Sequence, residues 1–352
     1  MNPGEVWWGQ IGTSLRLIRS ICNCMRDSKS AFLQAPQHIP WAQEFYAAVD
    51  ARRPAYSGER RLVRVPWKDG KEPGALALEH CSSGIRANYW PGQTYADYLG
   101  GREDLEICDY YLWVTGVRTK ADAEKWVSFL SDYARASSKL RQPAVFIVEY
   151  AGEYTHPAPA ETALLTYTVA DYDCRVFALE LANALKNTAQ PIYQAELALC
   201  ASGTDPEFCW ALLSTGEKLL KDSVRTVTTV NQTGQTSDGA PFEKKSENQI
   251  ESALWEAALI QLFPILERFR LRMIEKYEGD LRAALPITNS NGESITDPQD
   301  LEIGPISSLI PRIKHIKYED AANIRLCRKI RNLVAHNKTV PYQDVIEMYR
   351  LK

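Results

Sequence analysis

The sequence lacks the phosphate-binding loop of nucleotide-dependent enzymes. The first expected strand, 31–33, continues into a loop at 34–41 that reads QAPQHIPW and contains neither glycine nor lysine. Glycines free the backbone N–H groups to surround a phosphate, and a lysine neutralises its charge. The third expected strand, 110–114, does not end in a magnesium-binding acid either. The chain therefore has no intact nucleotide-binding signature.

A nucleophile for hydrolysis is also missing. No serine or cysteine stands in a nucleophile elbow of the form G-x-S-x-G. The histidines His38 and His80 are separated by two expected elements and have no such partner nearby in the sequence. The sequence thus gives no support to a serine or cysteine hydrolase.

Paired cysteines of the zinc-binding kind are absent. The eight cysteines are scattered, at Cys22, Cys24, Cys81, Cys108, Cys174, Cys200, Cys209 and Cys327. Zinc sites use pairs separated by two residues, and this spacing does not occur here. We expect reduced, mostly buried thiols, no metal site and no cofactor.

Long apolar runs and a strong net charge are absent as well. The longest apolar stretch, 254–266, is interrupted by Glu256, Gln261 and Pro264 and falls short of the ~20 residues of a membrane span. The first residues lack the basic stretch and apolar core of a secretory signal. The net charge of -3 provides no global basic field for nucleic acid. We expect a cytoplasmic protein that does not enter a membrane and whose nucleic-acid contacts, if it makes any, are local.

The N-terminal half alternates strands with helices. The expected strands are 31–33, 61–65, 110–114, 144–148 and 164–169, and the expected helices are 13–25, 41–52, 75–80, 95–99 and 121–137. Residues 144–148 are apolar on consecutive positions, which is typical of a central strand that helices cover on both faces. This order predicts an α/β domain over 1–172 with a doubly wound, mostly parallel sheet.

The C-terminal half, 173–352, is predicted to be all-helical. Its expected helices are 177–185, 193–199, 208–220, 250–277 and 319–335. A polar insertion at 226–248 interrupts them as an exposed hairpin or a flexible loop. Asn291-Gly292 predicts a hairpin within 287–296, and Asp297-Pro298 predicts the start of a short helix.

The layout of 30–169 resembles a degenerate ATPase domain of bacterial defence systems, although the resemblance rests on the order of elements and not on a motif. It implies a domain that binds protein partners without hydrolysing a nucleotide. An unrelated α/β scaffold is the alternative.

The segment Arg331-Asn332-Leu333-Val334-Ala335-His336 closes the last large helix. Arg331 and His336 are separated by ~140° around a helix axis and ~7.5 Å along it, so they do not share one narrow stripe. Across a symmetric helix–helix contact, however, the arginine of one chain can meet the histidine of another.

In these residues the chain resembles the HEPN superfamily of helical ribonucleases, whose motif is an arginine, a polar residue and a histidine after four to six intervening residues. The resemblance covers at most 208–352 and rests on Arg331, Asn332 and His336. It implies that Arg331 stabilises the charged phosphorane, that His336 exchanges protons with the RNA 2′-hydroxyl or the leaving oxygen, and that Asn332 positions one of them. Such chemistry needs no metal. Some members of the superfamily have lost catalysis and act only by binding.

A structural role explains the same residues in another way. His336 can complement the negative end of the helix dipole, Asn337 can provide a left-handed cap, and Arg331 can pair with an acid of a neighbouring helix.

The surroundings of the motif are locally basic, through Arg325, Arg328, Lys329 and Lys338, with Arg312, Lys314, His315 and Lys317 just before the helix. These side chains predict contacts with an RNA backbone. The alternative is an ordinary solvated face.

The leading hypothesis is a bacterial antiviral or toxin-type protein that cleaves RNA without metal, acts as a homodimer and senses a trigger through its α/β half. The second hypothesis is a non-enzymatic adaptor of a multi-protein defence complex, with a pseudo-ATPase domain. A DNA-binding regulator ranks last, because no helix combines base-reading residues with phosphate contacts.

Overall fold

The computed structural model describes residues 1–54, 60–90, 92–154, 162–288 and 292–352. The chain divides into two compact units, Met1–Asp173 and Cys174–Lys352. No helix of the described residues is both long and apolar enough to cross a membrane.

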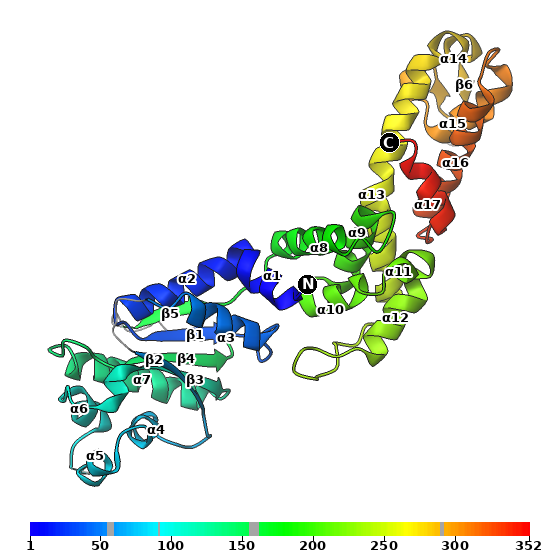
Figure 1. Cartoon of the computed structure of the whole chain (residues 1–352). Helices are drawn as coiled ribbons and strands as arrows, with labels where there is room; N and C mark the ends of the chain where they lie inside the picture. The colour runs from blue at the N-terminus through cyan, green and yellow to red at the C-terminus, as the bar shows by residue number, and fades with distance from the viewer. Residues whose placement is uncertain (55–59, 91, 155–161, 289–291) are drawn as a thin grey trace. The chain divides into compact units, whose positions relative to one another are not determined.

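The N-terminal unit contains a five-stranded sheet in which every neighbouring pair is parallel (Figure 1). Its strands are β1 (Ala31–Ala35), β2 (Arg61–Pro66), β3 (Tyr110–Val117), β4 (Val145–Ala151) and β5 (Ala163–Thr166), in the order β2-β3-β4-β1-β5. Residues 145–150 of β4 are all buried, and β4 is the middle strand, as its consecutive apolar residues predicted. The predicted parallel α/β fold is confirmed.

Helices cover both faces of this sheet (Figure 1). They are α1 (Pro3–Gln10), α2 (Gly12–Arg26), α3 (Ala42–Ala51), α4 (Pro73–Glu79), α5 (Ser83–Ala87), α6 (Tyr95–Gly100) and α7 (Lys120–Ala136), with a 3₁₀ turn, η1, at Glu106–Asp109. On one face, Phe146 packs against Trp126 and Phe129 of α7. On the other, Phe45 of α3 lies between Trp8 of α1 and Trp113 of β3. Helix α1 is an addition to the predicted elements.

The C-terminal unit is helical apart from one small hairpin. Its elements are α8 (Asp171–Leu185), which begins in the first unit, α9 (Pro191–Ser202), α10 (Pro206–Leu213), α11 (Glu217–Lys221), α12 (Ser223–Thr233), α13 (Glu247–Lys276), α14 (Glu278–Ala284), β6 (Ile287–Thr288), β7 (Ser294–Ile295), η2 (Pro298–Asp300), α15 (Ile303–Leu309), η3 (Ile310–Arg312), α16 (Tyr318–Ala335) and α17 (Tyr342–Tyr349). The all-helical class predicted for this half is therefore confirmed, with the hairpin that was also predicted.

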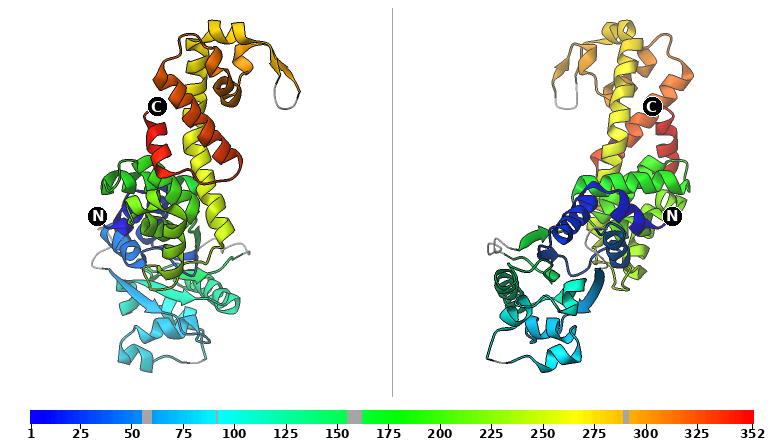
Figure 2. Two further views of the ribbon diagram at one scale, coloured as in Figure 1. Left: turned by 90° about the vertical axis from the view of Figure 1, so that its right-hand side faces the viewer. Right: turned by 60° about the vertical axis from the view of Figure 1, so that its left-hand side comes forward.

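The longest helix of this unit is α13, and α16 and α17 both pack along it (Figure 2). A capping box between Ser246 and Gln249 starts α13. The helix continues without interruption through Pro264.

The polar insertion differs from the prediction in its first part. Residues up to Thr233 continue helix α12, because Val227 and Asn231 are buried against the rest of the unit. Beyond it, a single antiparallel bridge joins Gln235 to Pro241, as in a hairpin. The Asn231 side chain holds the segment before α13 against α12. Its amide donates to the Glu243 carbonyl (2.7 Å), and its oxygen accepts from the Lys245 N–H (2.9 Å).

The predicted hairpin is present, since Ile287 pairs with Ile295 and Thr288 with Ser294. Asn291 of its predicted turn lies outside the described residues. Asp297 caps the following turn by accepting from the Gln299 N–H (3.0 Å), although this turn is a 3₁₀ turn and not an α-helix.

Candidate functional site

The motif helix α16 is held at its start by a buried acid. The Asp320 carboxylate accepts hydrogen bonds from Lys276 Nζ (2.5 Å) and from the Tyr277 hydroxyl. Burial of Asp320 opposes ionisation, but these two donors outweigh it and lower the pKa of the carboxyl below its ordinary value. The acid also complements the positive end of the helix dipole.

The middle of α16 is fixed against α17. The Lys329 ammonium pairs with the Asp344 carboxylate (2.7 Å), and the Cys327 thiol contacts the Met348 sulfur (3.8 Å). Burial raises the pKa of Cys327 to about 12, so this thiol is uncharged and structural.

The end of α16 is closed by a Schellman motif, which the sequence indicated through Asn337. Asn337 adopts the left-handed conformation (φ 54°) and its N–H donates to the Val334 carbonyl (3.2 Å), while the Lys338 N–H donates to the Leu333 carbonyl (2.9 Å). The Trp255 indole of α13 donates to the Val334 carbonyl (2.7 Å). The helix end that carries the motif is therefore a well-supported platform.

The motif residues themselves reach the surface. Asn332 and His336 are exposed, and they continue a stripe that begins with Arg325 and Lys329, at spacings of four, three and four residues. No other described residue forms a hydrogen bond or ion pair with the His336 side chain. These four side chains share one solvent face of α16.

Arg331 lies on a different side of the helix. Its guanidinium pairs with the Glu302 carboxylate at the N-terminal end of α15 (2.7 Å), and its side chain is 41% exposed. The structural alternative for Arg331, a pair with an acid of a neighbouring helix, is thus present. Within one chain the structure does not bring Arg331 to His336, in agreement with the ~140° that helix geometry puts between them.

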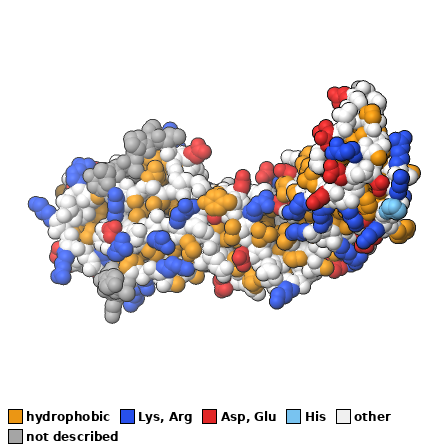
Figure 3. All heavy atoms as spheres, turned by 90° about the horizontal axis from the view of Figure 1, so that it is seen from above, with side chains coloured by type: hydrophobic (Ala, Val, Ile, Leu, Met, Phe, Trp, Pro, Cys, Tyr) orange, Lys and Arg blue, Asp and Glu red, His pale blue; other side chains and the backbone are white. Residues whose placement is uncertain are grey.

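The predicted backbone-contact residues are on the surface too. Arg325, Arg328 and Lys338 are exposed, and none of the described residues forms an ion pair with them. On the face of the C-terminal unit drawn in Figure 3, Lys and Arg side chains lie among acidic ones. Lys329 differs from the others, because Asp344 already neutralises it.

Two acidic partners of the site were not identified from the sequence. Glu302 lies 29 residues before Arg331, and Asp344 lies 15 residues after Lys329. An exposed glutamate before a short helix carries no signal that it will meet an arginine of another helix. Groups of three or more potential metal ligands do not occur among the described residues.

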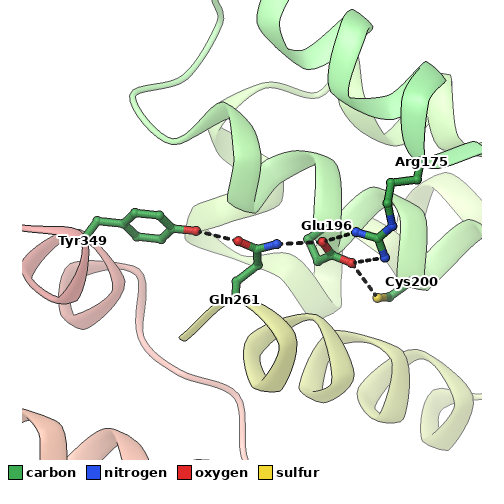
Figure 4. A network of polar contacts seen from close by, with 5 residues as sticks. All are labelled: Arg175, Glu196, Cys200, Gln261 and Tyr349. Atoms are coloured by element: carbon green, nitrogen blue, oxygen red, sulfur yellow. Dashed lines mark hydrogen bonds and ion pairs between the residues drawn. The ribbon is translucent and has the colours of Figure 1, made fainter. Parts of the chain in front are cut away.

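A polar network around the buried Glu196 connects α8, α9, α13 and α17 (Figure 4). The Glu196 carboxylate, 3% exposed, accepts two hydrogen bonds from the Arg175 guanidinium (2.8 and 3.0 Å) and one from the Gln261 amide (2.7 Å). The Tyr349 hydroxyl of α17 donates to the Gln261 oxygen (3.2 Å). Burial, assisted by Glu196, raises the pKa of both Cys200 and Tyr349 to about 12, so neither ionises near neutral pH.

Removing Glu196 should destabilise the helical unit. In Glu196→Ala, Gln261 and Arg175 lose their acceptor. Because Arg175 is half-exposed, we expect the free energy of unfolding to fall by about 2–3 kcal/mol, less than for a fully buried pair. Urea denaturation followed by circular dichroism measures it. Glu180→Ala, on the exposed side of α8, is the matched control and should change stability little. Equal stability of the two variants would contradict a supporting role of the network.

Comparisons with known proteins leave the family open. No protein-family model matches the chain, and no curated protein matches it significantly. Among solved structures the chain is similar to the RuvB Holliday junction branch migration motor of Thermotoga maritima, with a TM-score of 0.35 and 11% sequence identity over 73% of this chain and 77% of that chain. At this TM-score the similarity assigns neither a family nor a function to the chain.

Proposed function

We propose that the C-terminal unit is a metal-independent, HEPN-like endoribonuclease, formed by two copies of the chain in a bacterial antiviral or toxin-type protein of the cytoplasm. The observation that carries the proposal is the exposed, capped end of α16, where Asn332 and His336 lie on the solvent face that begins with Arg325 and Lys329. Catalytic side chains need such support to be held in place. None of the described residues forms a hydrogen bond or an ion pair with the His336 imidazole.

Each motif residue has a defined task in this chemistry. His336 accepts the proton of the RNA 2′-hydroxyl or donates one to the leaving oxygen, which an imidazole can do near neutral pH. Arg331 binds the oxygens of the phosphate as negative charge develops on them. Asn332, one helical turn before His336, positions the imidazole or the phosphate. Arg325, Arg328 and Lys338 bind the RNA backbone on either side.

The two key side chains must come from different chains. Arg331 and His336 point ~140° apart around α16, so one chain does not direct both at the same phosphodiester. In a two-fold contact the same surface meets itself, and Arg331 of one copy can approach His336 of the other. Each dimer would then contain two equivalent sites.

A direct test incubates the purified wild-type protein with total RNA in the presence of a chelator and examines the ends of the fragments. Attack by the 2′-hydroxyl predicts cyclic phosphate ends, and it predicts that a 2′-deoxy substitution at the cleavage position protects the substrate. Intact RNA under all conditions, with an otherwise folded protein, would leave the adaptor function as the better account.

Glu302 should weaken RNA binding by holding Arg331. For Glu302→Gln we expect a rise in RNA affinity of up to about fivefold, since an exposed ion pair contributes 0–1 kcal/mol. Fluorescence anisotropy with a non-cleavable 2′-deoxy oligonucleotide measures the affinity. Glu319→Gln, an exposed acid at the other end of α16, is the control and should have a smaller effect. A lower affinity of Glu302→Gln would mean that Glu302 positions Arg331 and does not compete for it.

The second candidate is an adaptor with a pseudo-ATPase domain, and a feature of the N-terminal unit favours this role for that unit. The loop after β1 packs against the rest of the N-terminal unit. Ile39 and Trp41 are buried, and the Trp8 indole donates a hydrogen bond to the Pro40 carbonyl (2.7 Å). In a phosphate-binding loop the backbone N–H groups face the ligand instead. We therefore propose that the N-terminal unit senses a trigger or binds a partner and does not hydrolyse a nucleotide.

A further inference from the structure

A groove in the N-terminal unit lies between α3 and the edge of the sheet. It has a volume of about 710 Å³ and is lined by Gln43 and Tyr46 of α3, Leu62, Arg64 and Pro66 of β2, and Thr115 of β3. Pro66 and Thr115 belong to the carboxyl ends of their strands, where parallel sheets bind ligands. Its volume is in the range of small-molecule sites.

The groove presents one fixed cation. The Arg64 guanidinium lies over the Tyr46 ring, 4.6 Å from its centre, and donates to the Gln43 side-chain oxygen (3.2 Å). None of the described residues forms an ion pair with Arg64. An arginine that lies over an aromatic ring and is hydrogen-bonded to a neighbouring side chain has lost much of its conformational freedom before a ligand arrives.

The buried Glu149 carboxyl holds Tyr46, the residue over which Arg64 lies. Glu149 of β4, 8% exposed, accepts one hydrogen bond from the Trp113 indole (2.5 Å) and one from the Tyr46 hydroxyl (3.2 Å). Burial raises the pKa of Glu149 to about 7, despite these donors and the nearby Arg64 charge, which lower it. Carboxyl groups whose pKa is strongly raised by burial occur often in functional sites, and Glu149 lies next to a groove.

Protection of an edge strand is the simpler explanation for a charged residue on β2. Arginine and proline at an edge discourage pairing with other chains, and this accounts for the exposed Arg61 and Pro66. It does not account for the series of contacts from Trp113 through Glu149 and Tyr46 to Arg64. Arg61 lies on the same strand but does not line the groove, so it is a natural comparison.

The charged groups at the groove favour a ligand with a single negative charge. Arg64 is the single cation among the described residues that line the groove, and Glu149 lies behind it. A planar carboxylate matches the arginine fork with one charge, whereas a phosphate dianion would bring a second charge that nothing compensates. Leu62, Val63 and Pro66 offer apolar contacts to the remainder of the molecule.

We propose that the groove between α3 and β2 binds a small organic monocarboxylate, whose carboxylate pairs with Arg64 and whose apolar part lies against Leu62 and Pro66. This site is independent of the RNA chemistry of the C-terminal unit.

The experiment uses the full-length protein labelled with ¹⁵N in its indoles and butyrate as the probe. The Trp113 indole signal, identified by its loss in Trp113→Phe, reports on the contacts beneath Arg64. We expect butyrate to shift this signal saturably in the wild type and in Arg61→Gln. In Arg64→Gln the affinity should fall roughly tenfold or more, because a charge-assisted pair is removed.

Sodium phosphate and sodium chloride at equal ionic strength separate a carboxylate site from general anion binding. The proposal is overturned if butyrate gives no saturable shift at millimolar concentration, if Arg61→Gln and Arg64→Gln lose it equally, or if phosphate shifts the signal as strongly as butyrate does.

Discussion

Replacement of His336 by alanine should reduce the rate of RNA cleavage about 10²- to 10⁴-fold, the range that general acid–base catalysis contributes. The imidazole is exposed at the end of α16, and only its backbone takes part in the helix cap, through hydrogen bonds from the His336 N–H to the Asn332 and Leu333 carbonyls. The variant should therefore keep its fold. Cleavage of a labelled oligonucleotide under single-turnover conditions measures the loss.

His315→Ala is the matched control, since His315 is another exposed histidine of the same unit outside the motif. Because His315 belongs to the basic segment before α16, its loss can weaken RNA binding, but at saturating protein concentration its cleavage rate should stay close to that of the wild type. Circular dichroism and melting curves establish that both variants are folded. If both retained full activity, His336 would have no catalytic role.

Glu149→Gln should make the protein more stable than the wild type in alkaline solution and leave it nearly unchanged in acid. The pKa of Glu149 is about 7 in the folded protein against an ordinary value of 4.5. The folded state thus holds a proton that the unfolded chain releases between these values, and stability falls as the pH rises through this window. The ionised carboxylate should cost about 3 kcal/mol above pH 7, and the glutamine variant avoids this cost.

Urea denaturation of the wild type and of Glu149→Gln at about pH 5 and about pH 8 measures this difference in stability, because protonated Glu149 dominates at the lower pH and ionised Glu149 at the higher. Tryptophan fluorescence is a suitable signal, because seven of the nine tryptophans lie in the N-terminal unit. Glu5→Gln, an exposed glutamate of α1, should show no difference from the wild type at either pH. A wild-type protein as stable at the higher pH as Glu149→Gln would contradict a raised pKa.

The sequence predicted the sheet well because its strands have a simple pattern. Residues 145–148 of β4 are apolar on both faces, which is typical of a central strand covered by helices on both sides. The left-handed cap at Asn337 was also predictable, because a helix end followed by asparagine has few alternatives.

The elements that the sequence did not reveal depend on tertiary contacts. Helix α1 is short and its adjacent Trp7 and Trp8 are both buried, so it shows no amphipathic period. The end of α12 is rich in threonine and polar residues, and it is helical because Val227 and Asn231 pack into the unit. Intrinsic propensity gives little information on such segments.

The candidate site also combines features that the sequence predicts with features that depend on tertiary contacts. The exposure of Asn332 and His336 follows from their places on α16, whereas the pairing of Arg331 with Glu302 depends on where α15 packs. The contact between Glu149 and Trp113 joins neighbouring strands at a register that no local pattern gives.

Mixing two inactive variants tests the shared ribonuclease site most directly. Arg331→Ala and His336→Ala are each expected to be inactive, but a dimer that combines them contains one site with both native side chains. After co-refolding in equal amounts, about a quarter of the wild-type cleavage activity should return, because half of the dimers are mixed and each of these has one intact site of two. No recovery in dimers shown to be mixed would contradict a site in which Arg331 and His336 come from different chains.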